Sequence, residues 1–510
     1  LLGGPRFAYR LWKDRTLNLR KLTAGTRVLV IGAGQAGETI ARHMLRDPDY
    51  LPIGFVDDKE RFRDSRIHGI PVLGQVSELG QIVTETIPDF LVIAIPSATN
   101  PQMQRIVDAC DRTGVRYRTL PRGSEINNGA SYLSDLRDVS IEDLLGREVV
   151  NLDWKLMNQG LEGKQILVTG GGGSIGSELC RQIARIGPSR LIVIEQSEYK
   201  LFLLQRELRA QFPSLRMAFC LADVCDVEAV DQVFERYRPN IVFHAAAYKH
   251  VALLEHQVRE AVRNNIIGTK LVAETAVSHG VLRFVLISSD KAVKPASVMG
   301  SSKRVAELVC SDLNKSGGTQ FVAVRFGNVL ASDGSVVPLF KEQIAAGGPV
   351  TVTHPDATRY FMTIPEACQL IMQTAVIGDG GDLYVLDMGE PVSINYLAEQ
   401  MIRLSGNKLG DDLEIQFIGL GAGEKLHEEL FYDDEKVVET AHPKIQRVRN
   451  DGARSPVFRE MLHKLVGACR RFDDREMTRM LRELVPQARI GEDSHDRVVP
   501  FTQTVCGSDE

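Results

Sequence analysis

Gln165 to Gly187 read QILVTGGGGSIGSELCRQIARIG, which is an apolar strand, a glycine-rich turn and an amphipathic helix in direct succession. Glycine has no Cβ, so the backbone of such a turn can approach a pyrophosphate closely. The helix that follows supplies N–H groups and a positive dipole end. The stretch therefore predicts a dinucleotide-binding turn. Five of its residues are candidate cofactor contacts: Gly170, Gly173, Ser174, Ile175 and Gly176.

Apolar stretches of strand length recur downstream of this turn, and helical stretches separate them. They read LIVIEQSE (191–198), MAFCLADVCD (217–226), NIVFHAAAYKH (240–250), RFVLISSDK (283–291), FVAVRFGNVL (321–330) and DLYVLDMG (382–389). Strands that alternate with helices are typical of the α/β class. We therefore predict a parallel, doubly wound sheet for this part of the chain.

A second glycine-rich turn lies nearer the start of the sequence. VLVIGAG (28–34) runs into a helical stretch, and Gly32, Gly34 and Gly37 form G-x-G-x-x-G. The fingerprint needs an acidic residue at the next strand end to hold a ribose, but Asp57 and Asp58 lie in a sequence that we interpret as a turn. Two interpretations stay open for this domain: a nucleotide-like ligand, or a regulatory or packing role.

Changes in composition divide the 510 residues into five predicted segments. They are a juxtamembrane segment (1–25), an N-terminal Rossmann-like domain (26–137), a linker with a short helix (138–163), a second Rossmann-like domain (164–487) and a disordered tail (488–510). The opening LLGGPRFAYRLWKDR is basic and aromatic, which suits the cytoplasmic edge of a membrane. We expect a membrane anchor before it; a frayed chain end is the alternative.

Charge and cysteine usage exclude several classes of function. A formal net charge of −5 gives no reason to expect a nucleic-acid partner. No run of about 18 apolar residues is present to span a bilayer. The eight cysteines show no pairs at metal-ligand spacing, so we expect reduced thiols and no metal site.

The residues that carry chemistry lie in VLISSDKAVKPASVMGSSKRVAE (285–307). An apolar run ends in Ser289, Asp290 and Lys291, and a helical stretch follows. Met299 and Lys303 are four residues apart, so they share one face of that helix. The pattern predicts a strand-end acid and amine facing a helix that presents a thioether and an ammonium group.

These residues resemble the short-chain dehydrogenase/reductase superfamily, which has Tyr-x-x-x-Lys where this chain has Met299 and Lys303. Together with the Asp-Lys pair, the methionine resembles bacterial, membrane-associated UDP-N-acetylglucosamine-type 4,6-dehydratases of polysaccharide biosynthesis. The resemblance covers Lys164 to about Leu430 and includes TGGGGSIGSEL, HAAAYKHV, RFGNVLASDGSVVPLF and GEKLHEEL. It implies an extended short-chain dehydrogenase/reductase with a C-terminal substrate-binding portion, and a homo-oligomer at the cytoplasmic face of the inner membrane.

The cofactor implied is NAD rather than NADP. Glu195 lies 19 residues after Gly176 at a predicted strand end, where a carboxylate accepts ribose hydroxyls and repels a 2′-phosphate. By resemblance, Asp223 and Val224 contact adenine, and Asn265 (or its neighbour Asn264) shapes the floor of the site. The small side chains of Ala245, Ala246 and Ala247 would let the cofactor lie against the backbone. Lys303 would contact the nicotinamide ribose.

The resemblance also implies a reaction in three steps. Hydride leaves sugar C4 for NAD⁺, water is lost across C5 and C6, and hydride returns to C6. Lys291 is the candidate C5 base and Asp290 the candidate C6 acid, which requires a lowered lysine pKa and a raised aspartate pKa through desolvation. Met299 cannot accept the C4 hydroxyl proton, so Ser289, or a water held by Ser289 and Lys303, is expected to replace the tyrosine.

Six residues are candidates for substrate binding. Cations suit the diphosphate or uracil, an amide suits the sugar, and a carboxylate suits the uridine ribose. The candidates are Lys249, His250, Asn328, Lys341, Arg359 and Glu428. Other functions stay open at this point: a C5-inverting dehydratase, a 4-epimerase of a UDP-sugar, or a non-catalytic nucleotide-sensing scaffold.

Overall fold

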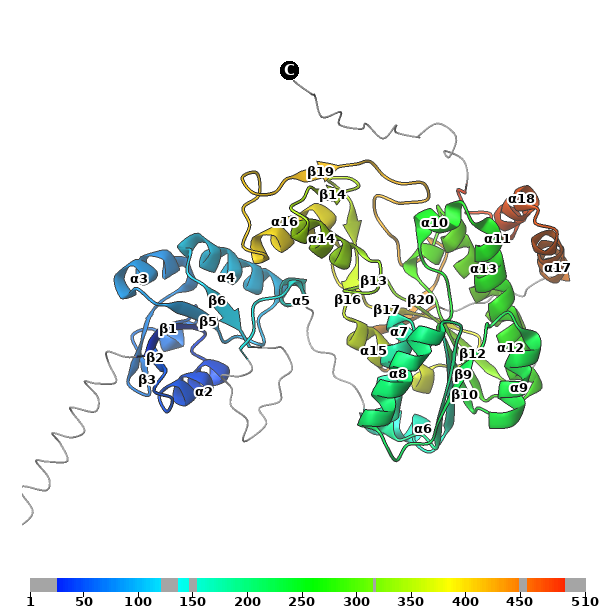
Figure 1. Ribbon diagram of the computed structural model, residues 1–510, viewed down its shortest axis with the longest axis horizontal. Helices are drawn as coiled ribbons and strands as arrows, with labels where there is room; N and C mark the ends of the chain where they lie inside the picture. Colours follow the sequence, from blue (N-terminus) through cyan, green and yellow to red (C-terminus); the bar gives the residue numbers. More distant parts are fainter. Residues whose placement is uncertain (1–24, 121–135, 146–153, 315–317, 449–455, 491–510) are drawn as a thin grey trace, which may run out of the picture. The chain divides into compact units, whose positions relative to one another are not determined.

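The computed structural model describes residues 25–120, 136–145, 154–314, 318–448 and 456–490. The chain divides into two compact units, residues 1–149 and 150–510 (Figure 1). The predicted juxtamembrane segment lies almost wholly outside the described residues, as does most of the predicted tail. At the start of that tail, the Arg489 amide donates a 2.9 Å hydrogen bond to the Pro295 carbonyl, and Ile490 is buried.

The first unit is built on a six-stranded sheet in the order β3-β4-β2-β1-β5-β6, parallel except for the β3–β4 pair. Its strands are β1 (Thr26–Ile31), β2 (Tyr50–Val56), β3 (Arg66–Ile67), β4 (Ile70–Gly74), β5 (Phe90–Ile93) and β6 (Tyr117–Thr119). Its helices are α2 (Gln35–Met44), α3 (Leu79–Thr86), α4 (Asn100–Thr113) and α5 (Ile141–Leu145). The Asp57 carboxylate accepts a 2.7 Å hydrogen bond from the Ala33 amide and so holds the glycine turn after β1.

The second unit contains a nine-stranded sheet in the order β20-β21-β17-β12-β11-β10-β7-β8-β9. The strands are β7 (Gln165–Thr169), β8 (Arg190–Glu195), β9 (Met217–Leu221), β10 (Ile241–His244), β11 (Arg283–Ile287), β12 (Gln320–Arg325), β17 (Leu383–Leu386), β20 (Val437–Glu439) and β21 (Ile445–Val448). Seven strands are parallel, and β21 and β20 add an antiparallel edge. The strand order reverses beside β7, which is where doubly wound sheets open a binding crevice.

Helices cover both faces of this sheet because alternate side chains of the strands point to opposite faces. On β7, Ile166 and Val168 join one buried cluster, while Leu167 joins the other. The first cluster lies under α6 (Trp154–Leu161), α7 (Ser174–Ile186), α8 (Glu198–Gln211) and α15 (Ile364–Ile377), and the second under α9 (Val227–Tyr237), α12 (Thr269–Ser278) and α13 (Val298–Leu313). The predicted α/β class, with two parallel Rossmann-like sheets, is confirmed. The helix α6 lies in the predicted linker and packs on α15.

A C-terminal portion stands beyond the carboxyl ends of β11 and β12 (Figure 1). It contains α14 (Val336–Ala345), α16 (Ile394–Leu404) and three two-stranded sheets, which pair β13 (Asn328–Val329) with β16 (Phe361–Met362), β14 (Val350–Val352) with β19 (Ile415–Phe417) and β15 (Thr358–Arg359) with β18 (Val392–Ser393). Near α13 lie α10 (Val251–Glu255), α11 (Val258–Ala261), a π-helix (Val262–Gly268), α17 (Pro456–Arg470) and α18 (Asp474–Leu484). Within the described parts of the chain, we find no helix whose length and apolar character would let it cross a bilayer.

The glycine turn after β7 gives a test of close packing. Gly170 has a φ of 66°, and a Cβ there would lie 2.7 Å from the backbone of Ala246. Gly187 has a φ of 81° but open space around it. We expect Gly187→Ala to lower the free energy of unfolding by roughly 1–2 kcal/mol, and Gly170→Ala by more than about 3 kcal/mol because a clash adds to the strain. Urea unfolding of both variants measures the difference; equal losses would contradict the close approach.

Candidate active site

The turn after β11 holds the acid and amine expected from the sequence. Ser289 begins a short 3₁₀ turn, Asp290–Ala292, and its hydroxyl donates to Asp290 Oδ1 at 2.8 Å. The same oxygen accepts from the Lys291 amide at 2.8 Å and from Lys291 Nζ at 3.1 Å. Asp290 is fully buried, and its Oδ2 has no hydrogen-bond partner. A buried carboxylate oxygen left without a partner costs free energy, so this atom is a site for a ligand hydroxyl or a proton.

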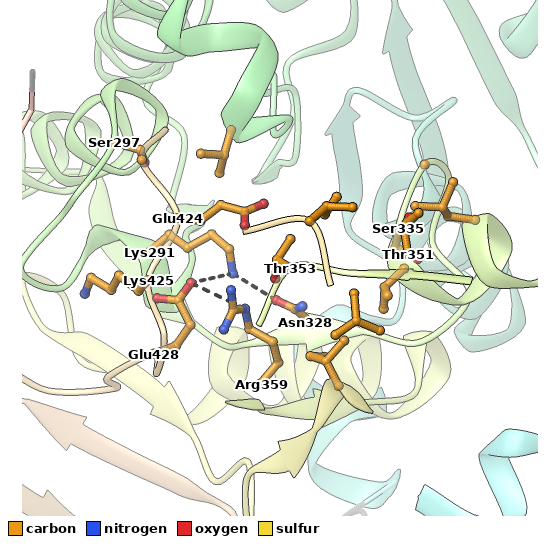
Figure 2. Close-up of a pocket in the computed structure, with 18 of the residues that line it drawn as sticks. Lys291, Ser297, Asn328, Ser335, Thr351, Thr353, Arg359, Glu424, Lys425 and Glu428 are labelled. Carbon is orange, nitrogen blue, oxygen red and sulfur yellow. Dashed lines mark hydrogen bonds and ion pairs between the residues drawn. The ribbon is translucent and has the colours of Figure 1, made fainter. Parts of the chain in front are cut away.

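Lys291 reaches away from the turn toward two further polar groups (Figure 2). Its Nζ donates to Asn328 Oδ1 at 2.8 Å and lies 3.4 Å from Glu428 Oε1. Burial alone would lower the pKa of this amine, but the Asp290 and Glu428 carboxylates outweigh it and raise the Lys291 pKa above its ordinary value. The prediction of a lowered lysine pKa is therefore wrong for the ligand-free protein: desolvation is present, but two anions accompany it.

Lys291, Asn328 and Glu428 line a cavity of about 290 Å³, whereas Ser289 and Asp290 are not part of its lining. Arg359, on β15, donates to the Thr358 and Leu426 carbonyls and places its Nε 4.0 Å from Glu428 Oε1. The second carboxylate oxygen of Glu428 is buried without a partner, as is Asp290 Oδ2. Apolar side chains form part of the wall: Val251, Val336, Leu339, Phe340, Ile394 and Ile418. Polar and charged side chains complete it, among them Ser297, Ser335, Thr351, Thr353, Glu424 and Lys425. A cavity with an apolar wall and a few convergent charges suits a small polar ligand.

Lys303 and Met299 occupy one face of α13, but their surroundings differ. Lys303 Nζ donates to the Ile287 carbonyl at 2.5 Å, and burial lowers its pKa to about 8 against the opposing charge of Glu307. Met299 is buried in an apolar cluster with side chains of α17 and α18. The helix approaches the turn closely at Gly300, where a Cβ would lie 2.2 Å from the Lys291 carbonyl oxygen. Lys303 thus faces the end of β11, while Met299 contributes packing.

The glycine turn forms a cradle of the kind that a dinucleotide needs. A Cβ on Gly176 would lie 2.1 Å from the Gly170 carbonyl oxygen, and that on Gly173 3.4 Å from the same atom. Glu195 accepts hydrogen bonds from the Gly172 amide at 2.8 Å and the Ser197 amide at 2.9 Å. Each carboxylate oxygen accepts more than one hydrogen bond, so Glu195 retains capacity for a ribose diol. These residues fit NAD.

The other candidate cofactor contacts lie at the glycine turn or follow neighbouring strands and helices of the second unit. Asp223 pairs with Arg263 at 2.7 Å; although burial opposes it, the hydrogen bonds of the Cys225 amide and Arg263 lower the Asp223 pKa. Asn265 accepts from the Tyr248 amide at 2.8 Å and donates to Ser302 Oγ at 2.9 Å. Ser174 and Ile175 lie at the glycine turn: Ser174 Oγ accepts a hydrogen bond from the Asp333 amide, and Ile175 packs on the core. The other positions follow neighbouring strands: Val224, which is buried, and Ala245 to Ala247, which come directly after β10.

Three predicted substrate residues do not line the cavity. Lys341 is exposed on α14 and is not part of the cavity lining. Lys249 Nζ donates to Ser332 Oγ at 3.2 Å, and the His250 ring lies against Gly334, so both contact the loop that leads into α14. Burial lowers the pKa of both side chains. Sequence reasoning missed Lys425, which lines the cavity and lies within the GEKLHEEL stretch that supplied Glu428.

Comparison with known proteins places this site in a family. A family model described as "Polysaccharide biosynthesis protein" matches residues 166–450. The chain belongs to this family. A second model, described as a CoA-binding domain, matches residues 6–121. The family membership predicted from the strand-end pair and Met299 is thereby confirmed.

Relatives extend over both units. "Probable polysaccharide biosynthesis protein EpsC" of Bacillus subtilis strain 168 is 45% identical over 447 residues, which are 87% of this chain and 74% of that protein. "Capsular polysaccharide biosynthesis protein CapD" of Staphylococcus aureus is 43% identical over 457 residues, 88% of this chain and 76% of that protein. The X-ray structure of Pen from Bacillus thuringiensis is 34% identical with a TM-score of 0.53, and the match covers 57% of this chain and 91% of that chain.

The hydroxyl of Ser289 offers a test of the turn. This hydroxyl donates to Asp290 Oδ1, and the thioether of Met299 has no acid-base capacity. We expect Ser289→Ala to lower kcat about a hundredfold with little change in thermal stability. Ser278→Ala is the control, because that exposed hydroxyl bonds only to the Glu274 carbonyl on α12. Unchanged turnover in Ser289→Ala, measured by the rate of nucleotide-sugar consumption, would remove Ser289 from the mechanism.

Proposed function

We propose that the second unit catalyses NAD-dependent 4,6-dehydration of a UDP-N-acetylhexosamine, with UDP-N-acetylglucosamine as substrate, to the UDP-4-keto-6-deoxy sugar. The observation that carries this proposal is the ion pair between the buried Asp290 and Lys291, of which Lys291 lines the cavity. An acid beside an amine suits proton donation at one sugar carbon and proton removal at the next. Membership of the polysaccharide-biosynthesis family supports a nucleotide-sugar substrate, and we propose that the product feeds surface-polysaccharide or glycan synthesis.

The glycine turn and Glu195 would hold the cofactor. Bound NAD would take a hydride from sugar C4 and return it to C6, so that none is consumed. Glu195 would accept the ribose hydroxyls and repel a 2′-phosphate, which favours NAD over NADP. Lys303, with an amine near the end of β11, would hold the nicotinamide ribose and lower the pKa of nearby hydroxyls.

Proton transfers would fall to the turn after β11. Asp290, through its unpartnered Oδ2, would give a proton to the departing C6 hydroxyl. Lys291, held by Asn328, would take the C5 proton. Ser289, or a water between Ser289 and Lys303, would accept the C4 hydroxyl proton that a tyrosine takes elsewhere in the superfamily. Arg359 and Lys425 are the cations of the cavity, and they would neutralise the diphosphate.

We also propose that the protein works at the cytoplasmic face of the bacterial inner membrane as a homo-oligomer. The support is compositional: residues 1–25 are basic and aromatic, as at a membrane edge. The description of the family as polysaccharide biosynthesis proteins is consistent with that location. Sedimentation of the intact protein with vesicles of anionic lipid, at low and high salt, tests it.

The reaction is tested by incubating the protein with UDP-N-acetylglucosamine in D₂O. We expect a 4-keto-6-deoxy product with one deuterium at C5, because solvent re-protonates that carbon, and no net NADH. Asp290→Asn should lower the rate about 10²- to 10⁴-fold while bound dinucleotide is retained. NMR of the product measures both the label and the configuration at C5.

The same spectra decide between this reaction and the alternatives. An inverted C5 would identify a C5-inverting dehydratase, and a 4-epimer with C6 oxygen retained would identify an epimerase, which needs no C6 acid. Bound dinucleotide with an unchanged sugar, across several UDP-hexosamines, would favour a nucleotide-sensing scaffold. The inverted C5 would fix the stereochemistry of the dehydration, whereas each of the other two outcomes would overturn the proposed reaction.

The raised Lys291 pKa predicts the pH dependence of the reaction. A lysine acts as a base only when neutral, so raising its folded-state pKa moves the rise of kcat/KM to higher pH. We expect kcat/KM to increase about tenfold per pH unit below that pKa. Glu428→Gln removes one of the anions that raise it and should shift the rise to lower pH. Glu424→Gln, in the same cavity and without an ion pair to Lys291, should not; identical profiles for all three proteins would exclude Lys291 as the base.

A further inference from the structure

The cavity wall includes a segment that lacks regular structure. Residues 423–435, which we name the substrate segment, lie between β19 and β20 and form only a single-residue bridge, Thr358 with His427. Glu424, Lys425 and Glu428 of this segment line the cavity. With so few backbone hydrogen bonds to a sheet or helix, the position of the substrate segment depends on its side-chain contacts.

Its strongest contact is with a buried arginine. Arg325, the last residue of β12, has no exposed surface and donates through Nη1 to both carboxylate oxygens of Glu435 at 2.9 Å. Glu435 Oε2 also accepts from the Tyr432 amide at 3.0 Å, and the Tyr432 hydroxyl donates to the Ala292 carbonyl at 2.8 Å. The ring of Tyr432 lies against the guanidinium at 5.5 Å. Two residues at the end of the substrate segment, Glu435 and Tyr432, therefore contact Arg325.

The other side of Arg325 faces the catalytic turn. Its Nε and Nη2 donate to the two carboxylate oxygens of Glu307 at 2.8 Å each. Glu307 Oε1 also accepts from Ser288 Oγ at 2.6 Å, one residue before Ser289. Burial opposes ionisation of Glu307, but Arg325 outweighs it and lowers the Glu307 pKa to about 2. One guanidinium thus joins the strand end that carries Ser289 and Lys291 to the segment that carries Glu428.

We infer that Arg325 and Glu435 are positioning residues that hold the substrate segment against the catalytic turn, and so set where Glu428 and Lys425 meet the nucleotide sugar. This inference rests on the proposed function for its substrate. A buried ion pair contributes little net stability compared with apolar groups of similar volume, whereas its geometry is specific. A bidentate arginine fixes both distance and orientation, which a single hydrogen bond does not.

The substrate segment makes other contacts, which differ from the Arg325–Glu435 pair. Lys294 pairs with Glu429 at 2.9 Å and with Asp433 at 2.8 Å, both near the surface. Lys425 donates to the Val293 carbonyl at 2.8 Å. Exposed pairs of this kind are worth little because solvent competes for them. The Arg325–Glu435 pair differs from these ion pairs because its guanidinium is fully buried and contacts both carboxylate oxygens.

The test is Glu435→Gln, which keeps the shape of the side chain and removes its charge. We expect the KM for UDP-N-acetylglucosamine to rise about tenfold or more, with the content of bound dinucleotide unchanged. Backbone amides of residues 423–435 should exchange with deuterium faster in the substrate-free variant. Tyr432→Phe, which removes only the bond to Ala292, should give smaller changes in the same direction and serves if Glu435→Gln does not fold.

Glu207→Gln is the matched control. Arg181 is likewise shared between two glutamates, with a two-atom contact to Glu207 and one to Glu178, but it joins α7 to α8 and does not touch the substrate segment. Positioning would be supported if Glu435→Gln and Glu207→Gln lost equal amounts of melting temperature, while only Glu435→Gln showed a raised KM and faster deuterium exchange. If KM and exchange matched the control, the pair would be structural and the inference overturned. If the wild-type protein left the sugar unchanged, the proposed function would fail, while the exchange comparison would still decide the inference.

Discussion

The site depends on one constraint: backbone amides beyond the ends of parallel strands still need hydrogen-bond partners. The segment that follows the adjacent strand supplies those partners. After β11 ends, the Ser288 amide donates to the Val324 carbonyl and the Asp290 amide to that of Phe326. Beyond β12, the Asn328 amide donates to the Tyr360 carbonyl. These hydrogen bonds keep the segments after β11 and β12 in register beyond the sheet. Lys291 therefore contacts Asn328, although 37 residues separate them.

Charge then distinguishes two lysines near the end of β11, of which Lys303 is buried and Lys291 is partly exposed. Lys291 stands between two carboxylates, which raise its pKa. Lys303 faces a neutral carbonyl, and burial lowers its pKa to about 8. The same kind of side chain therefore holds its proton more firmly at Lys291 than at Lys303.

Local patterns predicted what local forces determine. The strands, the glycine turns and the turn at Ser289 follow from hydrophobic periodicity and residue type, and the structure contains them all. The direction of the Lys291 pKa could not be predicted, because Glu428 lies 137 positions away in the sequence and only folding brings its charge near. Arg325 and Glu435 are likewise 110 residues apart. Residue type alone likewise gave no position for Lys341, which lies exposed on α14 and outside the cavity lining.

Met299 and the turn after β11 differ in the polar groups that they present. Met299 is buried in a cluster with apolar side chains of α10, the π-helix and α18. A phenol at this position would need a hydrogen-bond partner, and Tyr248 is a member of the cluster that carries a hydroxyl. The turn instead presents polar groups in three consecutive residues, Ser289 to Lys291, whose oxygens and nitrogens bond to one another. A substitution at any one of these three residues should therefore rearrange the hydrogen bonds of the others.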